Sequence, residues 1–129
     1  LGYKKIAKIK KKIYFKLKKK LSYLKHIEFP NNLRNKYRDY YLFPIGVDKK
    51  IRNKLIEHLT SKKIFVTVNF ESITSLSFYK KKYKVKNCLN SNEWGKKTLS
   101  LPFHAKLKEK EINQICKEID FFFLKRKIK

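Results

Sequence analysis

The chain has 129 residues, 42% hydrophobic and 15% aromatic, which suffices for one domain with a packed core. Its formal net charge is +25, and only four of its 35 basic residues are arginine, the type that bidentate phosphate and base-edge recognition favours. No apolar run approaches the roughly 18 residues of a membrane span, and the lysines before Leu24 exclude a signal-peptide core.

The first predicted element is a helix of about six turns that ends before Pro30. Its apolar residues recur every three or four positions between lysines: Ile6, Ile9, Ile13, Leu17, Leu21 and Leu24. Such a helix either docks on the domain with a solvated lysine face or binds a membrane surface or a nucleic acid. Docking is the interpretation that the regular apolar stripe favours.

A loop, two strands and a second helix are predicted next. Residues 31–39 are polar and charged, which indicates a loop, and residues 40–47 form an aromatic strand that Pro44 places at an edge or a bulge. Asp48 suits the N-cap of a helix that ends near Thr60 and Ser61 and whose apolar stripe is Ile51, Leu55, Ile56 and Leu59. The β-branched residues 64–68 predict a second strand.

The last part of the chain is predicted to be mainly helical. Residues 72–83 indicate an irregular turn or a short helix, and residues 91–97 a short helix that buries Trp94. Residues 98–104 then lead, with an extended entry at Pro102, to a final helix with the apolar stripe Ile112, Ile115, Cys116, Ile119, Phe122 and Phe123. This order predicts one α/β domain, more narrowly an α+β small domain whose small antiparallel or mixed sheet packs against helices.

Spacing alone reveals no catalytic constellation. His26, His58 and His104 have no metal-ligand interval between them, so a surface position or a satisfied side chain is the simplest interpretation of His26 and His58. With three glycines there is no phosphate-binding glycine loop. Cys88 and Cys116 lack a CxxC or Cys/His spacing, so we expect neither a disulfide nor a zinc site, and a reducing cytoplasm as the location.

Several short motifs follow one another from Tyr41 to Phe123. Residues 41–45 and Asp48 precede an R-x-x-L-x-x-x-L pattern that begins at Arg52, and Lys63-Ile64, the loop 68–74 and Tyr79-Lys80 come next. Residues 99–104 then read L-S-L-P-F-H, before Leu107, Glu111 and Ile112. In this order the motifs resemble the C-terminal small domain of the DegT/DnrJ/StrS family of pyridoxal-phosphate-dependent sugar aminotransferases, a domain of the fold-type I enzymes. Residues 1–39 resemble it only loosely.

The resemblance implies a domain that closes over the active site of an enzyme that moves an amino group, typically from glutamate, onto a keto-sugar nucleotide. It implies an entry helix within residues 1–30, an α/β core over residues 40–104 and a terminal helix over residues 107–125. The expected partners are an upstream large domain of the same chain, a second subunit of a homodimer and the nucleotide-sugar substrate, but no membrane.

The resemblance also implies that pyridoxal phosphate belongs to the large domain. That domain supplies the lysine that forms a Schiff base and the carboxylate that faces the pyridine nitrogen. We therefore expect no catalytic, cofactor-binding or metal-binding residue in this chain, and no transamination by it alone. The absence of methionine and the start at Leu1 likewise predict a piece of something longer or a trimmed product.

The substrate-pocket candidates that the resemblance implies are Asn69, Phe70, Thr74, Tyr79 and His104. The corresponding loop of the family reads H-Y-x-P-L-H, and this chain has Asn69 and Thr74 in place of the two histidines and Glu71-Ser72 in place of the proline-containing centre. An amide and a hydroxyl can hydrogen-bond a sugar but do not titrate near pH 7.

Other candidate residues carry two interpretations. His104 either orders the turn before the last helix or lines the interdomain cleft. Tyr40, Tyr41 and Arg52 either pack and lie at the surface or face the nucleotide.

Two other functions stay open. A lysine-rich nucleic-acid-binding accessory protein would use residues 8–20 and 80–86, with Phe78 and Tyr83 for stacking. A truncated, non-catalytic relative is the other. A/T-rich codons would produce the many lysines without any ligand, and the lysine runs would then be solvated faces.

Overall fold

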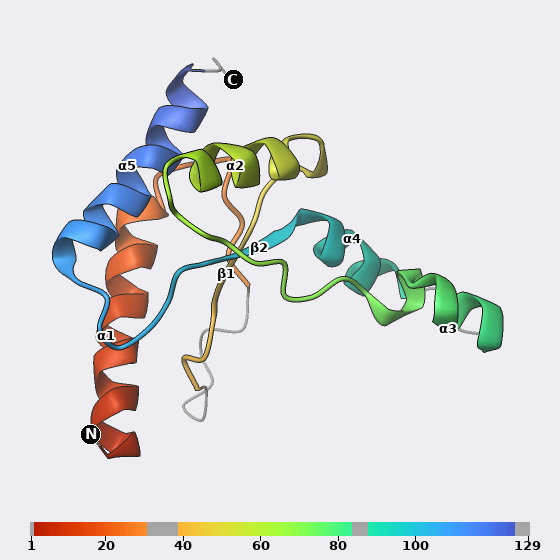
Figure 1. Cartoon of the computed structure of the whole chain (residues 1–129), viewed down its shortest axis with the longest axis horizontal. Helices are drawn as coiled ribbons and strands as arrows, with labels where there is room; N and C mark the ends of the chain where they lie inside the picture. The colour runs from red at the N-terminus through yellow and green to blue at the C-terminus, as the bar shows by residue number, and fades with distance from the viewer. Residues whose placement is uncertain (1, 31–38, 84–87, 126–129) are drawn as a thin grey trace.

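The computed structural model describes residues 2–30, 39–83 and 88–125, and confirms the predicted fold class (Figure 1). A two-stranded antiparallel sheet packs against helices. The elements in chain order are α1 (Tyr3–Leu21), β1 (Phe43–Gly46), α2 (Lys49–Ser61), the 3₁₀ turn η1 (Ile73–Ser75), α3 (Ser77–Lys82), α4 (Leu89–Lys97), β2 (Thr98–Leu101) and α5 (Glu109–Lys125). Across these described ranges, no helix is long and apolar enough to cross a bilayer.

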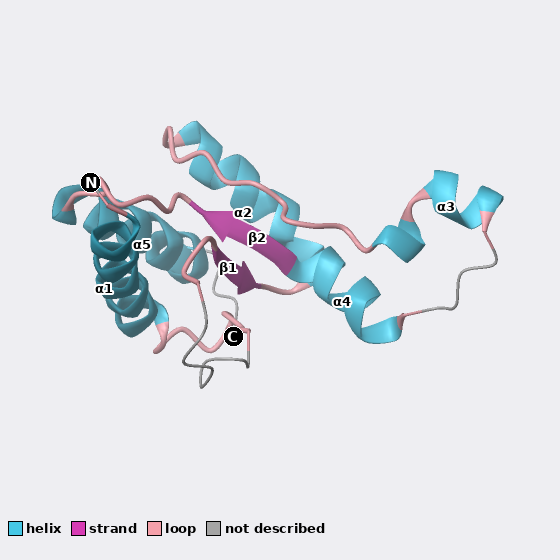
Figure 2. Cartoon of the chain, turned by 90° about the horizontal axis from the view of Figure 1, so that it is seen from below, coloured by secondary structure: helices cyan, strands magenta, loops and turns pink. Residues whose placement is uncertain are grey.

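The sheet lies at the centre of the domain; α1 and α5 run side by side, and α2 packs against both β2 and α5 (Figure 2). Phe43 is opposite Leu101 and Gly46 is opposite Thr98. Single bridges from Glu28 to Gly46 and from Thr67 to Ser100 extend the pairing on both sides. Pro44 has no such bridge in the described residues, so its missing N–H faces an unpaired edge, as the sequence predicts.

The prediction of a second strand over residues 64–68 is wrong. Residues 64–68 are extended, but they pair with β2 only through the backbone of Thr67, whereas the amide of Ile64 bonds back to Leu59 at the end of α2. The true partner of β1 is residues 98–101, which we expected only to connect two helices. All four residues of β2 are buried, so this short segment lacks the alternation by which a half-buried strand is recognised.

The first helix is shorter than predicted. It ends at Leu21: the bond from the amide of Ser22 to the carbonyl of Lys18 is the last of the helical type, and the amides of Leu24 and Ile27 then bond three residues back, in two successive turns. Both residues remain in the core although they follow the helix. The predicted 31–39 loop lies, except for Asp39, outside the described residues.

Two of the later helices differ slightly from the prediction. The final helix begins at Glu109, where the carboxylate of Glu111 accepts from the amide of Lys108 as in a capping box. The short helix α4 begins two residues earlier than expected, and its Trp94 is half-buried. The 3₁₀ turn and α3 confirm the short-helix prediction for residues 72–83.

An aromatic cluster anchors the core. Tyr14 of α1 and Phe43 of β1 are fully buried with their ring centroids 4.9 Å apart, and Phe103 lies 6.1 Å from Phe43. Aliphatic residues of all the large elements complete the core, among them Leu17, Leu21, Ile45, Leu55, Leu59, Leu99, Ile115 and Ile119. The core therefore ties α1 and α5 to the sheet and to α2.

Asp48 caps α2 as predicted, because its carboxylate accepts from the amide of Lys50 at 2.7 Å. Replacing Asp48 with alanine should lower the free energy of unfolding by about 1 kcal/mol, since one amide of the first turn loses its acceptor. Asp48→Asn keeps an acceptor and should cost only a few tenths of that amount. Urea denaturation of the two variants checks this, and equal losses would contradict a capping role.

Candidate functional site

The candidate site is a projection from the sheet. It consists of residues 69–83 and 88–97, and we call it the arm. Figure 1 shows α3 at the far end of this arm and α4 linking it to β2, and Figure 2 shows the same separation from the body. The arm carries four of the five predicted pocket residues, Asn69, Phe70, Thr74 and Tyr79. The structure thus brings these four together on one projection.

A cluster of hydroxyl and amide groups pins the loop of the arm onto α4. The Thr74 hydroxyl donates to the Asn92 side chain at 2.7 Å and lies 2.9 Å from the Ser72 hydroxyl. The Ser91 hydroxyl reaches Ser72 at 3.1 Å, and Ser72 is buried. Thr74 therefore has a structural partner already. This cluster was not identified from the sequence. The only sign of it in the sequence is that Ser, Thr and Asn recur in two segments about 18 residues apart.

The loop packs this closely because α4 has a glycine where the two meet. A Cβ atom built on Gly95 would lie 2.9 Å from the backbone nitrogen of Ser72. The side chain of Asn69, at the start of the loop, accepts a hydrogen bond from the Thr67 hydroxyl. The loop is thus held at its start, by Thr67, and at Ser72, by its close approach to α4.

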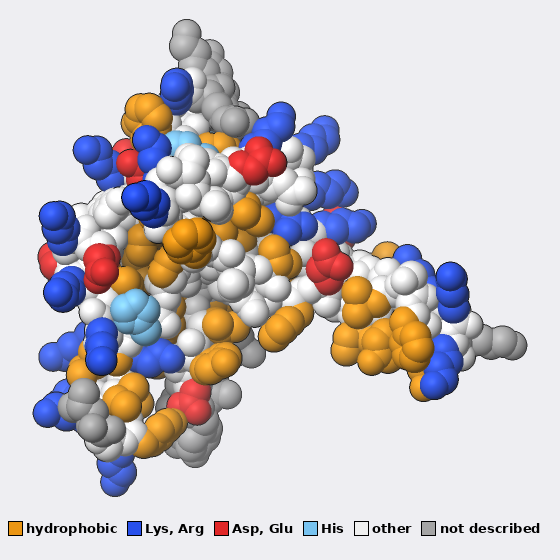
Figure 3. Space-filling view, in the orientation of Figure 1, with side chains coloured by type: hydrophobic (Ala, Val, Ile, Leu, Met, Phe, Trp, Pro, Cys, Tyr) orange, Lys and Arg blue, Asp and Glu red, His pale blue; other side chains and the backbone are white. Residues whose placement is uncertain are grey.

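The arm exposes an apolar and aromatic surface, visible as the orange patch on the projection in Figure 3. Phe70 is 74% exposed and Ile73 60% exposed. The Tyr79 and Tyr83 rings stack with centroids 6.1 Å apart, and the ammonium of Lys82 lies over Tyr83 at 5.6 Å. An apolar patch rimmed by lysines is typical of a surface that another chain segment or a ligand covers.

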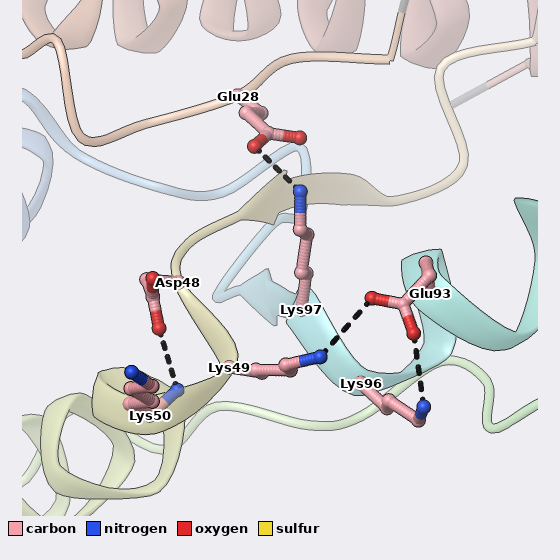
Figure 4. A network of polar contacts seen from close by, with 7 residues as sticks. All are labelled: Glu28, Asp48, Lys49, Lys50, Glu93, Lys96 and Lys97. Carbon is pink, nitrogen blue, oxygen red and sulfur yellow. Dashed lines mark hydrogen bonds and ion pairs between the residues drawn. The ribbon is translucent and has the colours of Figure 1, made fainter.

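Ion pairs fix the root of the arm (Figure 4). Glu93 of α4 pairs with Lys96 at 2.9 Å and with Lys49 of α2 at 3.5 Å, and these two lysines lower the pKa of its carboxyl, Lys96 most. Lys97 pairs with Glu28 at 2.9 Å, which raises the pKa of the lysine. Each exposed pair contributes little energy. Together they join α4 to α2 and to the segment that follows α1.

His104 lies away from the arm. It is exposed, its carbonyl accepts from the amide of Leu107 in the turn before α5, and it lines a groove of about 450 Å³. The groove also contains Lys62, Lys63 and Glu111. Figure 1 places this turn and α3 at opposite ends of the domain. The backbone of His104 takes part in this turn, and its side chain lies at a different place in the domain from the four candidates on the arm. Whether His104 lines an interdomain cleft stays a prediction.

The remaining candidates differ in their contacts. Tyr40 is half-buried against the ring of Tyr14, at 4.9 Å. Tyr41 is exposed, and the ammonium of Lys10 donates to its carbonyl at 3.1 Å. Arg52 is half-buried, and its buried Nε has no hydrogen-bond partner within the described ranges.

The other two histidines contact α5, and the ring of His58 has a hydrogen-bond partner there, as predicted for a satisfied side chain. His26 stacks on Phe123, with ring centroids 4.9 Å apart. The Nε2 atom of His58 lies 3.1 Å from the carbonyl and 3.2 Å from the carboxylate of Glu118 on α5. Both histidines therefore join α5 to the rest of the domain.

The described residues do not fit pyridoxal phosphate. A Schiff-base lysine reacts as the neutral amine, which burial favours, yet no lysine in the described ranges is buried. Nor do these ranges contain a group of three or more His, Cys, Asp or Glu side chains placed to hold a metal ion. The surfaces that the domain does offer are the arm and the shallow groove beside His104.

Cys116 is half-buried on α5, and burial raises the pKa of its thiol to about 11. The thiolate is the nucleophile, so iodoacetamide at pH 8 should alkylate Cys116 at least about tenfold more slowly than the exposed Cys88. Peptide mass spectrometry over time measures both rates. Addition of urea should make them equal, and equal rates in the folded protein would contradict the burial of Cys116.

Comparison with known proteins identifies the family. No curated protein matches the sequence, but several solved structures have the same fold. The aminotransferase TlmJ from Streptoalloteichus hindustanus is 17% identical, with a TM-score of 0.80 over 89% of this chain and 31% of that one. PseC from Helicobacter pylori, an aminotransferase involved in the biosynthesis of pseudoaminic acid, is 16% identical, with a TM-score of 0.80 over 93% of this chain and 33% of that one. A DegT DnrJ EryC1 StrS aminotransferase from Brucella abortus is 21% identical (TM-score 0.76, 92% and 31%).

The chain thus spans about a third of the length of each of these structures. The sequence profile of one family matches residues 3–120, which cover α1, the sheet, the arm and most of α5. The order of motifs that the sequence displays and the fold agree with this match. The chain belongs to the DegT/DnrJ/EryC1/StrS aminotransferase family.

Proposed function

We propose that this chain is the C-terminal small domain of a pyridoxal-phosphate-dependent aminotransferase that acts on keto-sugar nucleotides. In this proposal the domain closes over an active site whose cofactor and Schiff-base lysine belong to a large domain upstream. Family membership and the fold support the aminotransferase assignment. No described lysine is buried as a Schiff-base lysine would be, which supports a cofactor site in another part of the enzyme.

The observation that carries the proposal is the arm. Its exposed Phe70 and Ile73 form an apolar surface, while the hydroxyl and amide cluster keeps the loop rigid. A rigid projection of this kind can shape a pocket that it does not itself contain, since positioning a substrate needs surrounding groups that hold still. The exposed Phe70 side chain is the most direct candidate for substrate contact, because Thr74 is bonded to Asn92 and Asn69 accepts from Thr67.

The proposed enzyme is a homodimer in the cytoplasm. The half-buried apolar side of the first turns of α1, at Ile6 and Ile9, would pack against the large domain. In the described residues neither cysteine forms a disulfide, which agrees with a reducing compartment.

The first test is the intact mass of the native polypeptide from its source, with an absorbance scan from about 330 to 430 nm for bound pyridoxal phosphate. The proposal expects a chain about three times heavier than 15.7 kDa that carries the cofactor band, because this chain spans about a third of its structural relatives. A polypeptide near 15.7 kDa without the band would overturn the proposal in favour of a non-catalytic relative.

The role of the arm is tested in the cofactor-carrying enzyme with two matched phenylalanine variants. Phe70→Ala on the arm should raise KM for the nucleotide sugar about tenfold, with a smaller effect on kcat, if the ring helps to bind substrate. Phe65→Ala, at a side chain that is 71% exposed and outside the arm, should change KM by less than about twofold. Equal effects of the two variants would contradict a pocket role for the arm.

A further inference from the structure

We infer that the outer face of α1 is a sequence-independent binding surface for duplex nucleic acid, independently of the proposed aminotransferase activity. Ten of the 19 residues of α1 are lysine and none is acidic. Phosphate contacts by lysine provide affinity without reading base identity, and four arginines in the whole chain leave little capacity for base readout.

The lysines occupy a wide sector of the helix. With about 100° per residue, Lys4 and Lys11 fall on one flank and Lys5, Lys12 and Lys16 on the other, about 120° away. Lys8 and Lys19 lie between the two flanks. The buried residues of α1 are all on the opposite side: Ile13, Tyr14, Leu17 and Leu21. The lysine face is therefore turned away from the core.

This face carries little compensating charge. Among the described residues the only ion pair of α1 joins Lys16 to Glu109 of α5. Lys10 and Lys18 lie over the rings of Phe103 and Phe29, at 5.0 and 5.6 Å, and are therefore turned toward the body of the domain, outside the lysine face. Figure 3 shows blue side chains projecting along the edge of the molecule where α1 runs. A single-sign face of this kind raises the local concentration of a polyanion.

The width of the lysine sector favours a duplex over a membrane. Phosphates line both sides of a major groove about 12 Å wide, so a helix about 10–12 Å in diameter can use both flanks at once. A flat lipid surface touches a helix along one line, so with the centre of the sector in contact the lysines of both flanks would lie off that line. None of residues 3–12 is buried, and Figure 1 shows this half of α1 extending past the sheet. Tyr3 and Lys10 contact Asp39 and Tyr41 on the other side of the helix, so a groove could receive the lysine face alone.

The test is fluorescence anisotropy of the 129-residue chain with two labelled 20-base-pair duplexes of unrelated sequence, from 50 to 200 mM NaCl. Both duplexes should bind equally well. If about six phosphates are neutralised, affinity should fall about a thousandfold over this range, with a slope of log K against log salt near about −5. A slope near zero, or a strong preference for one sequence, would overturn the inference.

Two variants with the same loss of charge identify the surface. Lys4→Gln, Lys8→Gln, Lys11→Gln and Lys12→Gln together should weaken binding at least about tenfold at 100 mM NaCl and make the salt slope shallower by about 3–4. The control carries Lys50→Gln, Lys54→Gln, Lys62→Gln and Lys81→Gln, exposed lysines of α2, its C-terminal end and α3, and should bind within about threefold of the wild type. Equal losses would show that net charge alone is responsible.

Three further measurements separate duplex binding from misfolding of the variants and from lipid binding. Circular dichroism should show both variants folded, and arginine at the same four positions of α1 should restore duplex binding. Vesicles of phosphatidylcholine with 30% phosphatidylserine provide the membrane comparison. Vesicle binding that is tighter than duplex binding and is lost in the same α1 variant would overturn the assignment in favour of a lipid surface.

Discussion

Replacing Phe43 with alanine is expected to lower the free energy of unfolding by about 3–5 kcal/mol. The side chain is fully buried in β1, and its ring lies within 4.9 to 6.2 Å of the rings of Tyr14, Phe29 and Phe103. These three rings come from α1, from the segment after α1 and from the segment after β2. Alanine would leave a cavity where four parts of the chain meet, and none of them can close it alone.

The measurement is urea denaturation monitored by circular dichroism, with Phe65→Ala as the matched control. Phe65 is 71% exposed, so the control should stay within about 0.5 kcal/mol of the wild type. A loss of such size approaches the whole stability of many small domains, and Phe43→Ala would then be largely unfolded in buffer. Similar losses in the two variants would contradict the central place of Phe43 in the core.

The helices were predictable because their signal is local and long. The stripe from Ile112 to Phe123 in α5 and the one from Ile51 to Leu59 in α2 repeat over several turns, and burial follows both stripes. The end of α1 was less predictable, because Leu24 continues the helical spacing although the chain turns after Leu21. A residue that packs in the core at helical spacing need not lie on the helix.

The strands show where local patterns fail. Residues 64–68 have the β-branched composition of a strand, yet only Thr67 pairs with a neighbour. Residues 98–101 form the true strand because they meet Phe43–Gly46, more than fifty positions earlier in the chain. Which of two short apolar segments pairs is decided by how the helices pack, and that information is not contained in either segment.

The candidate site was predictable only through the order of its motifs. Asn69, Phe70, Thr74 and Tyr79 do lie together on the arm, but their composition alone would not have indicated a site. The contacts of Thr74 with Asn92 and of Ser72 with Ser91 join segments about 18 residues apart, and the sequence does not show which hydroxyls meet. His104, at the end of an equally clear motif, lies elsewhere in the domain.

Alanine in place of Gly95 is expected to release the loop of the arm from α4. In an unhindered helix this change would add about 1 kcal/mol of stability. Here the new Cβ atom would lie 2.9 Å from the nitrogen of Ser72 and 3.4 Å from the carbonyl oxygen of Phe70, which are backbone atoms and cannot rotate away. Overpacking of this kind costs about 1–3 kcal/mol, so separation of the loop from the helix is the favourable response.

Hydrogen exchange at the loop amides measures this release directly. The amides of Ser75 and Leu76 bond to the carbonyls of Ser72 and Ile73, and their exchange should become at least about tenfold faster in Gly95→Ala. The control is Gly2→Ala, where a Cβ atom would meet nothing within 4 Å, and it should leave this exchange unchanged. Unchanged exchange in Gly95→Ala would contradict this prediction, because α4 and not the loop would then have shifted to accommodate the methyl group. Faster exchange would show that the candidate pocket residues keep their position because residue 95 has no side chain. Only then can the loop lie against α4, where Ser72 and Thr74 bond to Ser91 and Asn92.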